Sequence, residues 1–114
     1  MGRTWVELIL EREAQLGADT IVRMAKIFVA DAKTQLNAIG SALLRNELAT
    51  ARNAAHQLRT NAGSLCFIIL EDSALECEQA CINGDLAKAT AVHRGLPALV
   101  DICVVQLRGR YQLG

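Results

Sequence analysis

The sequence has few of the residues that build sheets, membrane spans or signal peptides. Its 114 residues include one proline, one tryptophan, one tyrosine and two phenylalanines. No run of alternating β-branched residues predicts a strand, and no apolar run approaches the roughly 20 residues that span a bilayer. A basic segment followed by an apolar stretch is also missing at the start, so no signal peptide is visible. We therefore expect a cytoplasmic protein with no membrane insertion.

The chain also lacks an excess of either charge. Twelve basic and twelve acidic residues give a formal net charge of zero. This balance argues against a nucleic-acid binder, which usually carries a basic excess or stripe, although a local basic patch is not excluded. No glycine-rich phosphate loop and no kinase-type nucleotide motif is present. The protein is thus not expected to be an enzyme that phosphorylates itself from ATP.

Four cysteines are present, and their positions argue for packing rather than for metal or disulfide chemistry. Cys66, Cys77, Cys81 and Cys103 lie on the apolar stripes of expected helices, where a free cysteine behaves as a small buried hydrophobe. Cys77 and Cys81 have the i, i+4 spacing that can bind a metal on a helix. No second ligand pair with suitable spacing follows, so a metal-binding bundle is the weaker alternative.

What the sequence does contain is alanine and leucine at helical spacing. Hydrophobic residues make up 52% of the chain, and their repeat at steps of three and four predicts closely packed helices. We expect an all-α fold: an up-and-down four-helix bundle with a short additional N-terminal helix. The single expected domain covers residues 1–114, with helices at about 4–14, 19–45, 47–66, 68–82 and 86–111.

Some residues inside these helices call for separate predictions. Leu44 should widen the apolar stripe of the second helix, and Gly40 should weaken or bend that helix locally. Pro97 lies inside the last helix and predicts a kink there, because proline removes a backbone hydrogen bond and clashes with the preceding turn. His93, one turn before it, is interpreted as a partly buried structural histidine.

The second histidine, His56, lies in a different setting. Arg59 and Thr60 follow it by one helical turn and Gly63 by two. One helix face therefore carries an imidazole, a guanidinium, a hydroxyl and a bare backbone beside an apolar stripe. A lone histidine in a helix is more often a packing or solvated residue. The small residues around His56 instead leave it open to another macromolecule.

The residues from 56 to 63 resemble a known motif. They read His56-Gln57-Leu58-Arg59-Thr60-Asn61-Ala62-Gly63, which is similar to the motif of the histidine-containing phosphotransfer (Hpt) domain family. That motif is roughly His-x-Leu-Lys-Gly, followed by small residues, an apolar residue and a glycine. The resemblance covers nearly the whole chain. It includes Leu16-Gly17-Ala18-Asp19 and Asn83-Gly84-Asp85-Leu86, each at the start of a long helix.

The resemblance implies a phosphocarrier in a two-component multistep phosphorelay. Nε2 of His56 would accept a phosphoryl group from an aspartyl phosphate on a receiver domain and pass it to an aspartate of another receiver. The implied partners are response-regulator receiver domains and a hybrid sensor kinase, and the protein is expected to be a monomer. No cofactor is expected on this chain, since the Mg²⁺ that assists the transfer would lie on the partner receiver domain.

The same resemblance assigns roles to further residues. Arg59 stands at the position of the family's lysine, where its guanidinium would stabilise phosphate. Glu78 lies 22 positions after the histidine, where the family often has a Glu or Gln that holds Nδ1 of the ring; the alternative is a solvated surface residue. The predicted partner-binding residues are Arg52, Asn53, Gln57, Thr60, Asn61 and Gly63, although Arg52 and Asn53 also fit plain solvated surface.

Two departures from the family pattern bear on the rate of transfer and on the choice of partner. Thr60 replaces the glycine that lets a receiver approach the histidine closely, and Cys66 replaces a later glycine at the helix corner. A β-branched side chain at residue 60 would hinder docking or offer a hydroxyl to the phosphate. At residue 66 we expect a packing adjustment. Thr60, together with Arg59 in place of the family's lysine, favours an alternative function: an Hpt-fold docking module that binds a receiver or regulator without efficient phosphotransfer.

Overall fold

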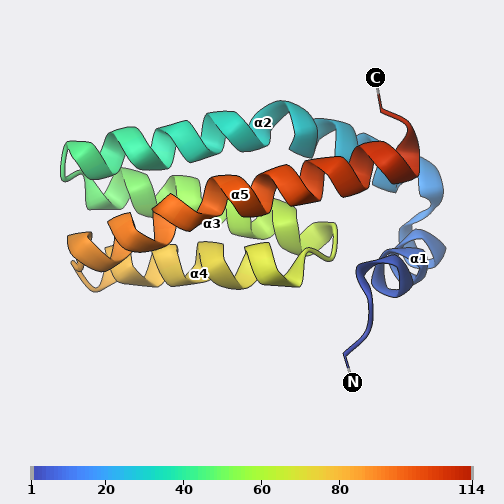
Figure 1. Cartoon of the computed structure of the whole chain (residues 1–114), viewed down its shortest axis with the longest axis horizontal. Helices are drawn as coiled ribbons and strands as arrows, with labels where there is room; N and C mark the ends of the chain where they lie inside the picture. The colour runs from blue at the N-terminus through green and yellow to red at the C-terminus, as the bar shows by residue number, and fades with distance from the viewer. Residues whose placement is uncertain (1, 114) are drawn as a thin grey trace.

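The computed structural model describes residues 2–113, so the two ends of the expected domain, residues 1 and 114, lie outside the described residues. Within that part of the chain it contains helices and no strand (Figure 1). The helices are α1 (Trp5–Leu16), α2 (Ala18–Leu44), α3 (Leu48–Ser64), α4 (Ile68–Ile82) and α5 (Leu86–Tyr111). The prediction of an all-α helical bundle is confirmed.

Helices α2 to α5 form a closed ring around one core. Helix α2 packs against α3 and α5, and α4 packs against the same two helices on the other side. From α2 to α5, consecutive helices run in opposite directions, whereas α1 lies across one end of the bundle (Figure 1). Alanines that are fully or almost fully buried occur on every one of the four long helices. Such small side chains let helix axes approach closely, which positions the surface residues of neighbouring helices within reach of one another.

The three connections within the bundle share one backbone geometry. In each, the residue with positive φ donates its N–H to the carbonyl three residues back, and the next residue donates to the carbonyl five residues back. This is the Schellman motif, which satisfies carbonyls at a helix C-terminus. The positive-φ residues are Asn46, Cys66 and Gly84, with φ angles of 56°, 64° and 72°.

The sequence pattern predicted that Cys66 lies on the core stripe of a helix, and this prediction was wrong. Helix α3 ends at Ser64, and Cys66 is a half-buried corner residue in the left-handed region, where glycine is favoured. Its Sγ lies 3.7 Å from the carbonyl oxygen of Leu8. The prediction for Leu44 was also wrong: the side chain is 91% exposed. It lies in the last turn of α2, where the buried positions are Ala42 and Leu43.

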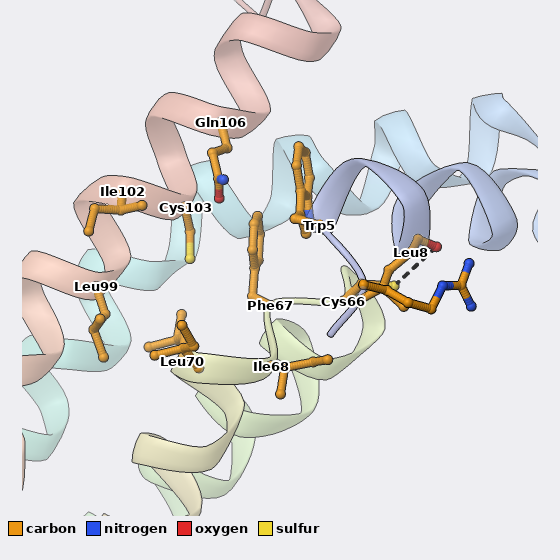
Figure 2. Close-up of a pocket in the computed structure, with 12 residues that line it drawn as sticks. Trp5, Leu8, Cys66, Phe67, Ile68, Leu70, Leu99, Ile102, Cys103 and Gln106 are labelled. Atoms are coloured by element: carbon orange, nitrogen blue, oxygen red, sulfur yellow. Dashed lines mark hydrogen bonds between the residues drawn. The ribbon is translucent and has the colours of Figure 1, made fainter. Parts of the chain in front are cut away.

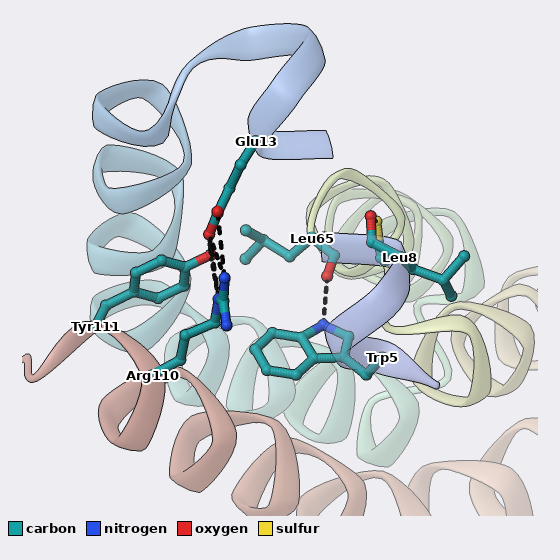
Figure 3. A network of polar contacts seen from close by, with 7 residues as sticks. Trp5, Leu8, Glu13, Leu65, Arg110 and Tyr111 are labelled. Atoms are coloured by element: carbon teal, nitrogen blue, oxygen red, sulfur yellow. Dashed lines mark hydrogen bonds and ion pairs between the residues drawn. The ribbon is translucent and has the colours of Figure 1, made fainter. Parts of the chain in front are cut away.

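Helix α1 is attached to the bundle by polar contacts at both of its ends. The indole Nε1 of Trp5 donates to the Leu65 carbonyl at 2.8 Å, and Arg12 donates to the Ser64 carbonyl at 3.1 Å. Glu13, the residue after Arg12, accepts hydrogen bonds from Arg110 and Tyr111 of α5 (Figure 3). The contacts with α3 satisfy carbonyls at its C-terminal end. Helix α1 thus closes one end of the bundle.

Gly40 has a packing role that the sequence did not reveal. A Cβ at this position would lie 3.0 Å from Cε1 of His93 on α5, so the missing side chain makes room for the imidazole. Nε2 of His93 lies 2.9 Å from the carbonyl oxygen of Leu36, and the residue is half-buried as expected. Helix α2 is continuous through Gly40, and α5 is continuous through Pro97.

Candidate functional site

His56 projects from the middle of α3 at the surface of the bundle. Its neighbours Ala55 and Leu58 are fully buried and fix the orientation of the helix against the core. The His56 side chain is 53% exposed. An imidazole in this position can be reached by a protein partner while its backbone is held rigidly by the packed face of the same helix.

Glu78 of α4 holds one ring nitrogen of this histidine. Its Oε2 lies 2.9 Å from Nδ1 of His56, and its side chain is only 11% exposed. Glu78 is the one charged residue that is buried among residues 2–113. The interpretation of Glu78 as a solvated surface residue therefore does not hold. A carboxylate that accepts a hydrogen bond from Nδ1–H leaves the lone pair on Nε2.

Arg59 completes a three-residue cluster with Glu78 and His56. Its Nε donates to Oε1 of Glu78 at 2.7 Å, and its Nη2 lies 2.9 Å from Nδ1 of His56. The guanidinium is therefore drawn to the Nδ1 side of the ring. For the predicted contact with a phosphoryl group on Nε2, the outer part of the Arg59 side chain would have to turn.

The cluster keeps Glu78 ionised. Burial raises the pKa of this carboxyl, but the hydrogen bonds from His56 and Arg59, together with the charges of both groups, lower it further than burial raises it. The net result is a pKa below the usual value of 4.5. The carboxylate can therefore balance a positive charge on the imidazole ring at neutral pH.

The predicted partner-binding residues surround His56 on α3. Arg52, Asn53, Gln57 and Thr60 are exposed, and Asn61 is half-buried. Asn61 also lines a hollow of about 110 Å³ together with Met24 and Ile27 of α2. Ile27 is 55% exposed, and its place beside the α3 face was not predicted, because heptad spacing alone does not show which flank of α2 meets α3.

Gly63 differs from the other members of this group. A Cβ on Gly63 would collide with the carboxylate of Glu71 on α4. The bare backbone therefore accommodates a side chain of the neighbouring helix in addition to lying on the His56 face. Nothing in the sequence around Glu71 indicated this contact, since it depends on the register between α3 and α4.

A larger hollow lies elsewhere in the molecule. It has a volume of about 250 Å³ and is bounded by α1, the α3–α4 corner, α4 and α5, with Trp5, Phe67 and Cys103 among its lining residues (Figure 2). Trp5 stacks on Phe67 with ring centroids 5.2 Å apart. None of the residues of the His56 cluster lines this hollow, so the two features are separate.

The cysteine pair on α4 lies in the core of the bundle: Cys77 is fully buried and Cys81 is 5% exposed. Burial raises the pKa of Cys77 to about 12 and also raises the pKa of Cys81. Across residues 2–113, no group of three or more His, Cys, Asp and Glu side chains is arranged to hold a metal ion.

No described helix is long and apolar enough to cross a membrane.

The fold and the site thus define a helical bundle that presents one histidine, oriented by a buried carboxylate, to the surroundings. The model of the Hpt domain family matches residues 23–109, which is most of the chain. The protein belongs to the Hpt domain family, as the resemblance had indicated. Members of this family are phosphocarriers rather than kinases, and they generally interact with receiver domains. No curated protein and no solved structure matches the chain.

Proposed function

We propose that this protein is a histidine phosphocarrier of a two-component multistep phosphorelay and that His56 is its phosphoacceptor. One observation carries the proposal: the half-exposed imidazole is held at Nδ1, 2.9 Å from a buried carboxylate of the next helix. When Nδ1–H donates to this carboxylate, the lone pair lies on Nε2, which is then the nucleophile. The family supports a phosphotransfer role in general, and the specific acceptor is our assignment.

In the proposed reaction, the lone pair on Nε2 of His56 attacks the phosphorus of an aspartyl phosphate. The bond from phosphorus to the aspartate oxygen breaks, and its electron pair returns to the aspartate carboxylate. The ring keeps its proton on Nδ1 and becomes positively charged, and Glu78 balances that charge. Transfer to a second receiver reverses these steps. Phosphoryl transfer of this kind needs mainly positioning and charge neutralisation.

The partners follow from the same proposal. Receiver domains would dock on the α3 face around His56, where Arg52, Asn53, Gln57 and Thr60 are exposed. A hybrid sensor kinase would supply the phosphoryl group through its own receiver domain, and Mg²⁺ would be bound by the receivers rather than by this chain. We expect a monomer that meets one receiver at a time. The cytoplasmic location expected from the sequence stays a prediction.

Phosphorylation by a labelled receiver tests the acceptor directly. A panel of receiver domains, each carrying ³²P on its aspartate, is incubated with the protein and with the variant His56→Gln. We expect the wild-type protein to take up label that is stable to base and lost in acid, and the variant to take up none. His93→Gln is the matched control, because His93 is the other histidine and bonds to the Leu36 carbonyl. Equal labelling of His56→Gln would show that the acceptor is another residue.

The second candidate function is a docking module that binds receivers without efficient transfer. Two observations favour it: Thr60 is exposed on the docking face one turn beyond His56, and Arg59 is held on the Nδ1 side of the ring. A docking module would bind receivers in a titration but take no label from any of them. Binding and labelling measured on the same panel therefore separate the two functions.

A further inference from the structure

The contacts around Nδ1 of His56 contain a conflict. Nδ1 lies 2.9 Å from Oε2 of Glu78 and also 2.9 Å from Nη2 of Arg59. A carboxylate oxygen can only accept a hydrogen bond, and a guanidinium nitrogen can only donate one. A neutral imidazole has either a proton or a lone pair on Nδ1 at any moment. The two contacts therefore require opposite tautomers and cannot both be hydrogen bonds at once.

The two tautomers differ in reactivity. When Nδ1–H donates to Glu78, the lone pair lies on Nε2, the nitrogen that contacts neither Glu78 nor Arg59. When Nδ1 accepts from Arg59, the proton lies on Nε2, which then has no lone pair for attack on phosphorus. The conversion moves one proton from one ring nitrogen to the other through solvent and leaves the total number of protons unchanged.

We propose that Arg59 competes with Glu78 for Nδ1 and so holds a fraction of His56 in the unreactive tautomer. This inference rests on the proposed function, because it concerns the regulation of the same site. Arg59 is thus a positioning residue that restrains the nucleophile. It stays anchored in both states, since its Nε is bonded to Oε1 of Glu78 at 2.7 Å while only Nη2 has to leave the ring. A partner anion that attracts the guanidinium away from Nδ1 would release the reactive tautomer.

The opposite role for Arg59 makes the opposite prediction. If Arg59 served only to hold Glu78 in place, its removal would loosen Glu78 and lower the population of the Nδ1–H tautomer. If Arg59 competes for Nδ1, its removal raises that population. The change expected for one hydrogen bond is roughly two- to tenfold in the ratio of the two tautomers.

Nitrogen-15 NMR of the unphosphorylated protein measures this ratio. Two-bond ¹H–¹⁵N correlation spectra distinguish protonated from unprotonated ring nitrogens, and they are recorded at a pH where the shifts no longer change and the ring is neutral. We compare the wild type with Arg59→Met, which keeps the length of the side chain without its donors, and with Glu78→Gln. Arg94→Met on α5 is the matched control, because Arg94 is an exposed arginine on another helix.

We expect the Nδ1–H fraction to rise in Arg59→Met, to fall in Glu78→Gln and to stay at the wild-type value in Arg94→Met. An unchanged or lower Nδ1–H fraction in Arg59→Met would overturn the competition. Circular dichroism of each variant verifies that the helices are intact. The measurement uses neither phosphate nor a receiver, so a failure of this inference is distinguishable from a failure of the phosphocarrier role, which the labelling experiment tests.

Discussion

At the scale of single residues, Thr60 is an exposed side chain one turn beyond His56, on the face where we propose that a receiver docks. It is exposed on α3, and its side-chain hydroxyl makes no hydrogen bond within residues 2–113, while its backbone carbonyl accepts from the hydroxyl of Ser64 at 3.0 Å. The family pattern has glycine at this position, which leaves room for close approach. The methyl and hydroxyl groups of Thr60 therefore add bulk at the site of contact without being fixed by the fold.

We predict that Thr60→Ala accelerates phosphoryl transfer from a labelled receiver several-fold, since relief of about 1 kcal/mol of steric cost corresponds to about fivefold. Alanine is preferred to glycine in this test because glycine in a helix costs about 1 kcal/mol of stability. Thr50→Ala, an exposed threonine on the same helix, is the control and should leave the rate unchanged. A slower reaction in Thr60→Ala alone would mean that the hydroxyl assists transfer.

Cys66 is one of the non-glycine residues whose backbone lies in the left-handed region. A φ of 64° suits glycine, whereas a side chain in this region costs about 1–2 kcal/mol. We predict that Cys66→Gly is more stable than Cys66→Ala by about 1 kcal/mol in urea unfolding. Both variants remove the thiol and its contact with Leu8, so their difference isolates the backbone. Equal stabilities would contradict the assignment of strain to this corner.

At the scale of elements, α1 is the helix whose attachment depends most on charge. Hydrogen bonds from Arg110 and Tyr111 lower the pKa of Glu13 below its usual value of 4.5. A lowered pKa in the folded state means that Glu13 contributes its full stabilisation above pH 4.5 and loses it as the pH falls through the folded pKa. The contact between α1 and α5 should therefore weaken in acid.

Tyr111 limits the same contact at the alkaline end. Burial, and then the hydrogen bond to Glu13, raise its pKa from 10 to about 12. A raised pKa favours the protonated phenol, so the stabilisation is complete below pH 10 and is lost as the pH rises through about 12. Between these limits α1 should stay attached to α5.

Trp5, the single tryptophan of the chain, reports on this attachment because it lies on α1 and stacks on Phe67. We predict an acid transition in Trp5 fluorescence below pH 4.5 that is much reduced in Glu13→Gln, whose amide does not titrate. Glu76→Gln removes an exposed carboxylate on α4 and should keep the wild-type transition. Identical acid profiles for the two variants would exclude Glu13 as the group that controls α1.

At the scale of the whole molecule, the sequence predicted those features that depend on one helix at a time. Apolar spacing identified the buried faces of α2, α3 and α5 because each face repeats within its own helix. Features that depend on two helices could not be predicted from the apolar spacing. Gly40 and Gly63 leave space for His93 and Glu71, which belong to other helices, and no local pattern encodes that register.

The candidate site shows the same difference between features of one helix and features that depend on two. The position of His56 on an open face followed from the residues around it on α3. The expectation for Glu78 came from the family resemblance, and the bond between the two is made across helices at 2.9 Å. The conflict between Glu78 and Arg59 over Nδ1 is visible only in three dimensions, because it depends on where the guanidinium folds back. The reactivity that we propose for His56 therefore depends on the distance between α3 and α4.

Small buried residues let neighbouring helices approach closely, and a larger side chain at Ala55 tests how far the site depends on this packing. Ala55 is fully buried next to His56, so Ala55→Val forces extra volume into the packed core at a cost of about 1–3 kcal/mol. Ala49→Val places the same side chain at an exposed position of α3 and should cost less than about 1 kcal/mol. Urea unfolding measures both values.

We further predict that Ala55→Val takes up phosphoryl label more slowly than Ala49→Val under conditions where circular dichroism shows both to be folded. The added bulk would separate α3 from the helices packed against it, and a shift of about 1 Å at a reacting group is enough to slow a reaction substantially. If the two variants react equally fast while Ala55→Val is clearly less stable, the histidine is oriented by α3 alone, and the contact with Glu78 does not govern its reactivity.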